Sequence, residues 1–234
     1  MIHPVRPARK HLALLVALVA MLVGQPLLAH TSAAAGLFFD ALFSAICLSM
    51  FFIVFGERRQ RQVALVPFLP ALASYFAPYV LPRGAQLPSE AVYHCSLVAF
   101  LGFTVLVILR DILRRSVISG DDVVGALCGY ILVALVWANL YALTYLLVPG
   151  TFSVNSNVAS QLAESHQRRA LFDYLSFATM MTLGYGDITP IGPPAYSLTW
   201  LEVMAGQFYM AVVVAQLVGL KLAQGLKGGG SEAK

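Results

Sequence analysis

Charged residues are scarce in this sequence: only 11% of its 234 residues are Asp, Glu, Lys or Arg. Soluble globular domains carry roughly 25% charged residues. The hydrophobic share is 59%, and a soluble fold of this size has too little interior to bury so much apolar surface. The scarcity of charge therefore excludes an ordinary soluble enzyme, a disordered regulator and a nucleic-acid-binding arm, and it predicts an integral membrane protein.

Cysteine is rare as well, and its three copies, Cys47, Cys95 and Cys128, all lie in apolar runs. An odd number without metal-ligand spacing predicts buried thiols and no disulfide framework. The sequence also lacks a nucleophile, base and orienting group at a workable spacing, and it has no glycine-rich phosphate loop. We therefore expect no enzymatic activity, no cofactor, no small-molecule substrate and no nucleic-acid partner.

Long hydrophobic runs are what the sequence does contain. A helix needs about 20 mostly apolar residues to cross a bilayer. The stretches that meet this requirement are residues 12–29, 36–55, 63–82, 91–109, 123–148 and 194–220. A further apolar segment, residues 170–182, is too short to cross and predicts a re-entrant segment between the last two spans. The expected fold class is an all-α membrane protein with six transmembrane helices.

The basic residues predict the orientation of these spans. If the N-terminus is cytoplasmic and six spans alternate, 12 of the 15 Lys and Arg residues fall on the cytoplasmic side and 3 on the outer side. We therefore expect both termini in the cytoplasm and a location in the plasma membrane, the inner membrane of a prokaryote. A cleaved signal peptide ending near residues 33–35 is an alternative for the first span, and it leaves the orientation of the others unchanged.

The segment between the last two spans reads Thr182-Leu183-Gly184-Tyr185-Gly186-Asp187. Glycine at alternate positions permits positive φ, so successive carbonyl groups can be turned to the same side. Strands from four chains around one axis would form rings of carbonyl oxygen that replace the water shell of a cation. Thr182 would add a hydroxyl ring at the inner end, and Asp187 a carboxylate at the outer mouth. Because the chain carries one such segment, these rings predict a homotetramer.

The residues before this segment are expected to form a short helix of about three turns. Asp173 would lie in its first turn, where a negative charge suits the helix dipole. The carboxyl end of the helix would direct partial negative charge toward the membrane centre, which favours a cation there.

This arrangement resembles the pore of the potassium channel family over residues 172–218. The residues that carry the resemblance are the filter Thr182–Gly186, Asp187, Pro190 and the helix that follows. The upstream helices, with residues 125–127 and 149–152, are similar to those of small prokaryotic six-span members. The resemblance implies passive and selective conduction of K⁺, with the ion bound at Thr182, Leu183, Gly184 and Tyr185.

The resemblance also divides the chain into regions. Residues 1–122 would form a four-helix N-terminal membrane region, residues 123–220 the pore domain, and residues 221–234 a short cytoplasmic tail. Within the pore domain we expect an outer helix at 123–148, a pore helix at 170–182, the filter at 182–187 and an inner helix at 194–220. Leu183, Met181, Ala178, Tyr174 and Leu175 depart from common family residues. These departures bear on filter rigidity and inactivation. They bear little on the choice of ion, because the carbonyl groups and not the side chains contact it.

Two residues of the last span have a functional and a structural interpretation. Gly206 lies 24 residues after Thr182, where family members commonly carry the gating-hinge glycine, and close helix packing is the alternative. Glu202 is an ionisable group well inside a span, where such groups are costly and usually functional. We hypothesise that a protonated Glu202 supports the filter by hydrogen bonding to the pore helix. A partly hydrated position near the outer end of the span is the alternative.

Other residues of the pore domain are placed by helical spacing. The set expected to line the inner cavity, or else to pack between helices, is Gln207, Met210, Ala211 and Val214. The set expected to form an aromatic belt at the outer membrane surface is Trp137, Tyr141, Tyr145 and Trp200.

Two other functions compete with a potassium channel. One is a weakly selective cation channel, and the other is a non-conducting or transporter-associated pore-loop subunit. Transporters of that type usually hold four pore repeats in one chain, whereas this sequence holds one. Residues 91–109 contain no Lys or Arg, so we expect no steep voltage dependence of the kind that arginine-bearing sensor helices produce.

Overall fold

The computed structural model describes residues 10–28, 33–80, 86–156, 159–162 and 165–229. Most of these residues are helical. The elements are α1 (Lys10–Leu28), α2 (Ala33–Ile53), α3 (Arg58–Val80), α4 (Gln86–Arg114), α5 (Gly120–Leu147), β1 (Phe152–Val154), η2 (Ala159–Leu162), α6 (Ser165–Met180), β2 (Ile188–Pro190) and α7 (Pro193–Gly229).

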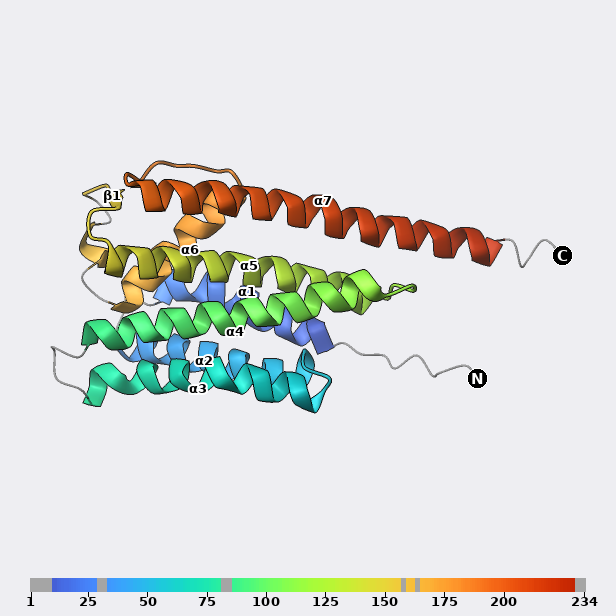
Figure 1. Ribbon diagram of the computed structural model, residues 1–234, viewed down its shortest axis with the longest axis horizontal. Helices are drawn as coiled ribbons and strands as arrows, with labels where there is room; N and C mark the ends of the chain where they lie inside the picture. Colours follow the sequence, from blue (N-terminus) through green and yellow to red (C-terminus); the bar gives the residue numbers. More distant parts are fainter. Residues whose placement is uncertain (1–9, 29–32, 81–85, 157–158, 163–164, 230–234) are drawn as a thin grey trace.

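The long helices lie side by side in one bundle, and α1 to α5 and α7 alternate in direction (Figure 1). Helix α5 is central, because it contacts α1, α4, α6 and α7. Helix α6 is short and oblique, and it lies between α5 and α7 (Figure 1). The start of α1 and the end of α7 lie toward the same end of the molecule (Figure 1).

Three helices in the described part of the chain are long and apolar enough to cross a bilayer: Leu87–Arg114, Gly120–Leu147 and Pro193–Gln224. They correspond to the fourth, fifth and sixth predicted spans, and the prediction of an all-α membrane protein is confirmed at this level. Helices α1 and α2 contribute shorter apolar runs, and α3 begins with a cluster of arginines. That α1, α2 and α3 cross the membrane stays a prediction.

One buried core joins the N-terminal helices to α5. Phe51 of α2 stacks on Phe100 of α4 with ring centroids 5.6 Å apart, and Phe68 of α3 lies 5.4 Å from the same ring. Leu18 of α1 and Leu132 of α5 are fully buried in this core. Because buried aromatic rings contribute much of the free energy of packing, the first four helices and α5 form one packed unit.

The helix before the filter differs from its predicted extent. Helix α6 begins at Ser165, five residues before the predicted start at 170, and ends at Met180 instead of Thr182. Arg168 and Arg169 make this first part polar, which is why an apolar-run criterion missed it. Asp173 consequently lies in the third turn, so the predicted interaction of its charge with the helix dipole was wrong.

A small antiparallel sheet is an addition that the sequence did not predict. Strands β1 and β2 pair Phe152 with Pro190, Ser153 with Thr189 and Val154 with Ile188. The sheet joins the segment after α5 to the segment that leads into α7. It therefore fixes the chain at one end of the bundle, beside α6 (Figure 1).

The start of the central helix α5 is stabilised by a capping box. The Asp122 backbone N–H donates to Ser119 Oγ at 3.3 Å, and the Ser119 N–H donates to Asp122 Oδ2 at 2.8 Å. Arg115 pairs with the same carboxylate at 2.9 Å. These bonds satisfy donors at the helix start that have no partner within the helix.

We predict that Ser119→Ala lowers the free energy of unfolding by about 1 kcal/mol, because it removes the capping oxygen. Thermal unfolding of the purified protein in detergent measures the change. Ser116→Ala is the matched control, since Ser116 is exposed and lies outside the helices. Equal midpoints for the two variants would contradict the capping role.

Candidate functional site

Helix α6 ends in a Schellman motif. The Leu183 N–H donates to the Ala178 carbonyl at 2.7 Å, and the Thr182 N–H donates to the Thr179 carbonyl at 2.9 Å. The motif requires a left-handed residue after the helix, which is usually glycine. Here Thr182 takes this conformation with φ of 59°. A β-branched residue at positive φ is strained, and such strain concentrates at functional sites.

The backbone beyond α6 alternates in handedness. Positive φ values occur at Thr182 (59°), Gly184 (57°) and Gly186 (79°), and Leu183 and Tyr185 between them keep negative φ. Alternation of this kind turns successive carbonyl groups toward the same side of the strand. The two glycines adopt the conformation at no steric cost, whereas the threonine does not.

The segment Thr182–Gly186 is exposed along its whole length in the single chain. With Met181 before it and Asp187 after it, the segment forms the whole connection between α6 and β2. Its backbone carbonyl groups can act as a row of oxygen ligands.

Asp187 lies where this segment enters the small sheet. Its carbonyl accepts a hydrogen bond from the Asn155 N–H at 2.9 Å, and its Oδ1 accepts from the Ile188 N–H at 3.1 Å. The exit of the segment is thus tied to the residue that follows β1.

Tyr185 packs against the helix that precedes it. Its ring stacks on the Tyr174 ring of α6 with centroids 6.4 Å apart and an interplanar angle of 7°. Its side chain is 69% exposed in the single chain. One face of the ring is therefore covered by α6, and the rest of the side chain is exposed in the single chain.

Glu202 lies in the interior between three helices. Its side chain is 0% exposed, and its carboxyl group is hydrogen-bonded to the hydroxyls of Tyr141 on α5 and Ser176 on α6. The partly hydrated position considered as an alternative is therefore wrong. The Ser176 hydroxyl also lies 2.7 Å from the Ala134 carbonyl. Since Ser176 has one hydroxyl proton, it can serve both contacts fully only if Glu202 carries a proton and donates it.

Tyr141 was expected in an outer aromatic belt, and this expectation was wrong. Its side chain is 0% exposed, because its hydroxyl donates to Glu202 in the interior. Sequence reasoning also missed Ser176 as a partner. The sequence did hold a signal for this contact. Tyr141, Ser176 and Glu202 are polar side chains inside apolar segments, and buried polar groups need hydrogen-bond partners in the interior.

Gly206 lies one turn beyond Glu202 on α7, against the end of α6. A Cβ atom at this position would lie 2.5 Å from Met180 Cγ, and Met180 is fully buried. Helix α7 runs without interruption through Gly206. The close packing that was the alternative to a hinge is therefore present, and the hinge role stays a prediction.

The residues predicted to line an inner cavity are all exposed in the single chain: Gln207, Met210, Ala211 and Val214. Met210 and Val214 line an apolar groove between α5 and α7, together with Met181, the residue that follows α6. Gln207 and Ala211 are not among the residues that line this groove. The structure thus brings two of the four residues together in one groove.

Comparison with protein families matches residues 141–220 to a model described as ion channel. The matched residues begin near the end of α5 and include α6, the segment Thr182–Gly186 and most of α7. No curated protein and no solved structure gave a significant match. The match thus covers the residues whose geometry is described above.

We predict that Gly206→Ala lowers the free energy of unfolding by about 1–3 kcal/mol, because the added methyl group overpacks the contact with Met180. Gly219→Ala in the same helix is the matched control, since a Cβ atom there meets nothing within 4 Å. The control should be neutral or stabilise the protein by up to about 1 kcal/mol. Thermal unfolding in detergent compares the two, and equal stability would show that the contact with Met180 is not tight.

Proposed function

We propose that this chain, whose residues 141–220 match an ion channel family model, is a subunit of a potassium-selective channel. It conducts K⁺ passively through a homotetrameric pore. The observation that carries the proposal is the alternating handedness of Thr182, Leu183, Gly184, Tyr185 and Gly186 directly after α6. Among the described residues, positive φ recurs at alternate positions nowhere else.

In the proposed pore, α6 is the pore helix and residues 182–187 form the selectivity filter. Carbonyl groups of Thr182, Leu183, Gly184 and Tyr185, with the Thr182 hydroxyl, replace the water shell of K⁺. The carboxyl end of α6 adds partial negative charge at the inner end of the filter. Asp187 lies at the outer mouth, where its carboxylate attracts cations.

The exposure of the filter supports an assembly of four chains. Unsatisfied backbone at membrane depth is tolerated only where protein or a water-filled path covers it. Helix α7 is also poorly covered, since 22% of its apolar window is buried, compared with 50% for α5. A fourfold ring of identical subunits covers both surfaces and closes the carbonyl rings.

Residues around the filter have supporting roles in this proposal. Glu202 holds α6 to α5 and α7 through Ser176 and Tyr141. Met210 and Val214, with Gln207 and Ala211, face the cavity below the filter, and Gly206 is the point where α7 bends when the pore opens. The role of Glu202 rests on its hydrogen bonds, the cavity positions on helical spacing, and the hinge on the resemblance of the Gly206 position to that of the family's hinge glycine.

The proposal includes the membrane topology. Six helices, α1 to α5 and α7, cross the plasma membrane, α6 is re-entrant, and both termini face the cytoplasm. The alternating directions of the helices, with the start of α1 and the end of α7 at one end, support this topology (Figure 1). Residues 1–122 then form the N-terminal membrane region, 123–220 the pore domain and 221–234 the cytoplasmic tail.

Purified protein in liposomes tests the function through reversal potentials in mixed K⁺ and Na⁺ solutions. We expect the reversal potential to follow the K⁺ gradient. Gly184→Ala should abolish this selectivity, because alanine at a φ of 57° costs about 1–2 kcal/mol in each chain. Gly102→Ala is the control, since Gly102 lies within α4 and a Cβ atom there meets nothing within 4 Å.

Each outcome separates the competing functions. A current that does not distinguish K⁺ from Na⁺ would identify a weakly selective cation channel. Absence of current, with a correctly folded protein, would identify a non-conducting or transporter-associated subunit. Either result contradicts the proposal.

A further inference from the structure

The first half of α6 carries two arginines that contact the N-terminal helices. Arg168 forms an ion pair with Glu90 of α4, and it donates a hydrogen bond to the Leu162 carbonyl at 2.9 Å. The side chains of Arg168 and Glu90 are only 11% and 21% exposed. Ion pairs shielded from water in this way are less screened than surface pairs.

Arg169 makes a second contact with the same region. Its guanidinium carbon lies 5.1 Å from the centre of the Tyr93 ring on α4 and 5.8 Å from that of Tyr75 on α3. Its Nη1 also donates to the Tyr93 hydroxyl at 3.2 Å. Guanidinium groups over aromatic faces at these distances are attracted by the ring electrons. We refer to Arg168, Arg169, Glu90, Tyr93 and Tyr75 as the arginine clamp.

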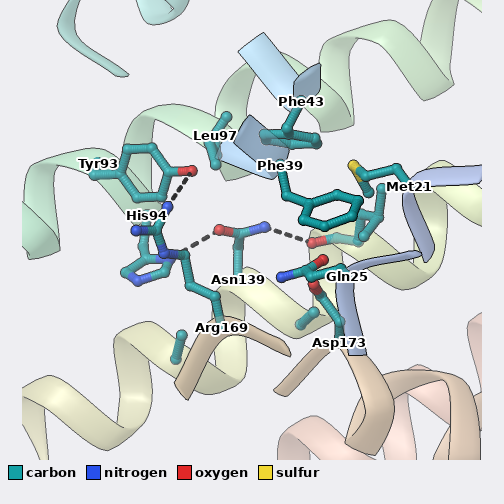
Figure 2. A pocket seen from close by; sticks show the side chains of 13 residues that line it. Met21, Gln25, Phe39, Phe43, Tyr93, His94, Leu97, Asn139, Arg169 and Asp173 are labelled. Atoms are coloured by element: carbon teal, nitrogen blue, oxygen red, sulfur yellow. Dashed lines mark hydrogen bonds between the residues drawn. The ribbon is translucent and has the colours of Figure 1, made fainter. Parts of the chain in front are cut away.

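The clamp borders a small cavity that reaches α5. Figure 2 shows the Arg169 side chain extending to Tyr93, with the hydrogen bond between His94 and Asn139 beside it. His94 Nδ1 and Asn139 Oδ1 lie 2.8 Å apart. The contacts of α6 with the N-terminal helices are therefore continuous with a polar contact between α4 and α5.

The dipole of α6 does not favour the two arginines where they lie. They occupy positions four and five of the helix that begins at Ser165, and positive charge near the amino end of a helix opposes its dipole. Arg169 Nε does donate to the Ser165 carbonyl of α6 at 3.3 Å, but the charged and aromatic partners of the two arginines, Glu90, Tyr93 and Tyr75, belong to other helices. These charges therefore attach α6 to α3 and α4.

Helix α6 is attached at its other end by a different set of residues. Ser176 is hydrogen-bonded to Glu202 of α7 and to the Ala134 carbonyl of α5. A helix of 16 residues is about 24 Å long and nearly rigid. A tilt at the clamp therefore displaces Met180 and the strained Thr182 that follows it.

We propose that the arginine clamp positions α6, so that the N-terminal helices set the geometry and the ion preference of the segment Thr182–Gly186. The part of this inference that concerns ion preference rests on the proposed function. Arg168, Arg169, Glu90 and Tyr93 are positioning residues, since they act on the filter through α6. Helices α3 and α4 thereby have a role that requires neither sensor arginines nor a bound ligand.

The test is a double-mutant cycle on the ion pair, with Glu90→Gln, Arg168→Gln and the double variant. The readout is the ratio of K⁺ to Na⁺ permeability from reversal potentials in liposomes. Each single variant should change this ratio by about twofold or more, and the double variant should add little, because both remove the same interaction. The exchanged pair Glu90→Arg with Arg168→Glu should restore the ratio toward the wild-type value.

Glu57→Gln and Arg59→Gln are the matched controls, because these exposed residues lie between α2 and α3 or at the start of α3. They change the same charges and should leave the ratio unaltered. Tyr93→Phe is a milder variant that removes the hydroxyl and keeps the ring, in case the charge variants do not fold. Unaltered ratios in all clamp variants, or fully additive effects in the cycle, would overturn the proposal.

Hydrogen exchange of residues 165–186 separates this inference from the proposed function. If the wild-type protein carries no K⁺ current, the proposed function is wrong. The hydrogen-exchange rates then still test whether the clamp positions α6. Exchange should be faster in Glu90→Gln and Arg168→Gln and slower again in the exchanged pair. Exchange that does not respond to these variants would overturn the clamp as a positioning device.

Discussion

The structure depends on one constraint, which is the placement of non-helical backbone within a membrane protein. From Thr182 to Gly186 the chain exposes polar groups that a helix would satisfy internally, and in the proposed pore lipid offers them no partner. The proposed pore therefore requires the segment's own geometry, its neighbours in the chain and further copies of the chain to support it. The alternating handedness at Thr182, Gly184 and Gly186 is the first of these supports.

The neighbours of the segment provide the second support. Helix α6 ends in a Schellman motif that sets the direction of the chain at Thr182. At the other end, Asp187 is tied to Asn155, and the β1–β2 sheet prevents the chain from moving away. Glu202 and the arginine clamp then hold α6 at two separate places. All of these contacts act on a stretch of five residues.

The parts that sequence could predict are those with a local signal. The scarcity of charge and the long apolar runs predicted the membrane class and the three longest apolar helices, since composition alone determines burial in lipid. Alternate glycines predicted that Gly184 and Gly186 could adopt positive φ, as they do. Contacts between distant residues have no such signal, so Tyr141 was misplaced and Ser176 was missed. The predicted start of α6 was wrong because Arg168 and Arg169 interrupt the apolar run from which the prediction was made.

The account is tested most directly by determining the structure of the assembled protein in K⁺ by electron cryomicroscopy. We predict four chains around one axis, with the carbonyl groups of Thr182, Leu183, Gly184 and Tyr185 directed toward it and ion density between their rings. An assembly with another number of chains, or one in which residues 182–186 face away from a common axis, would contradict the account.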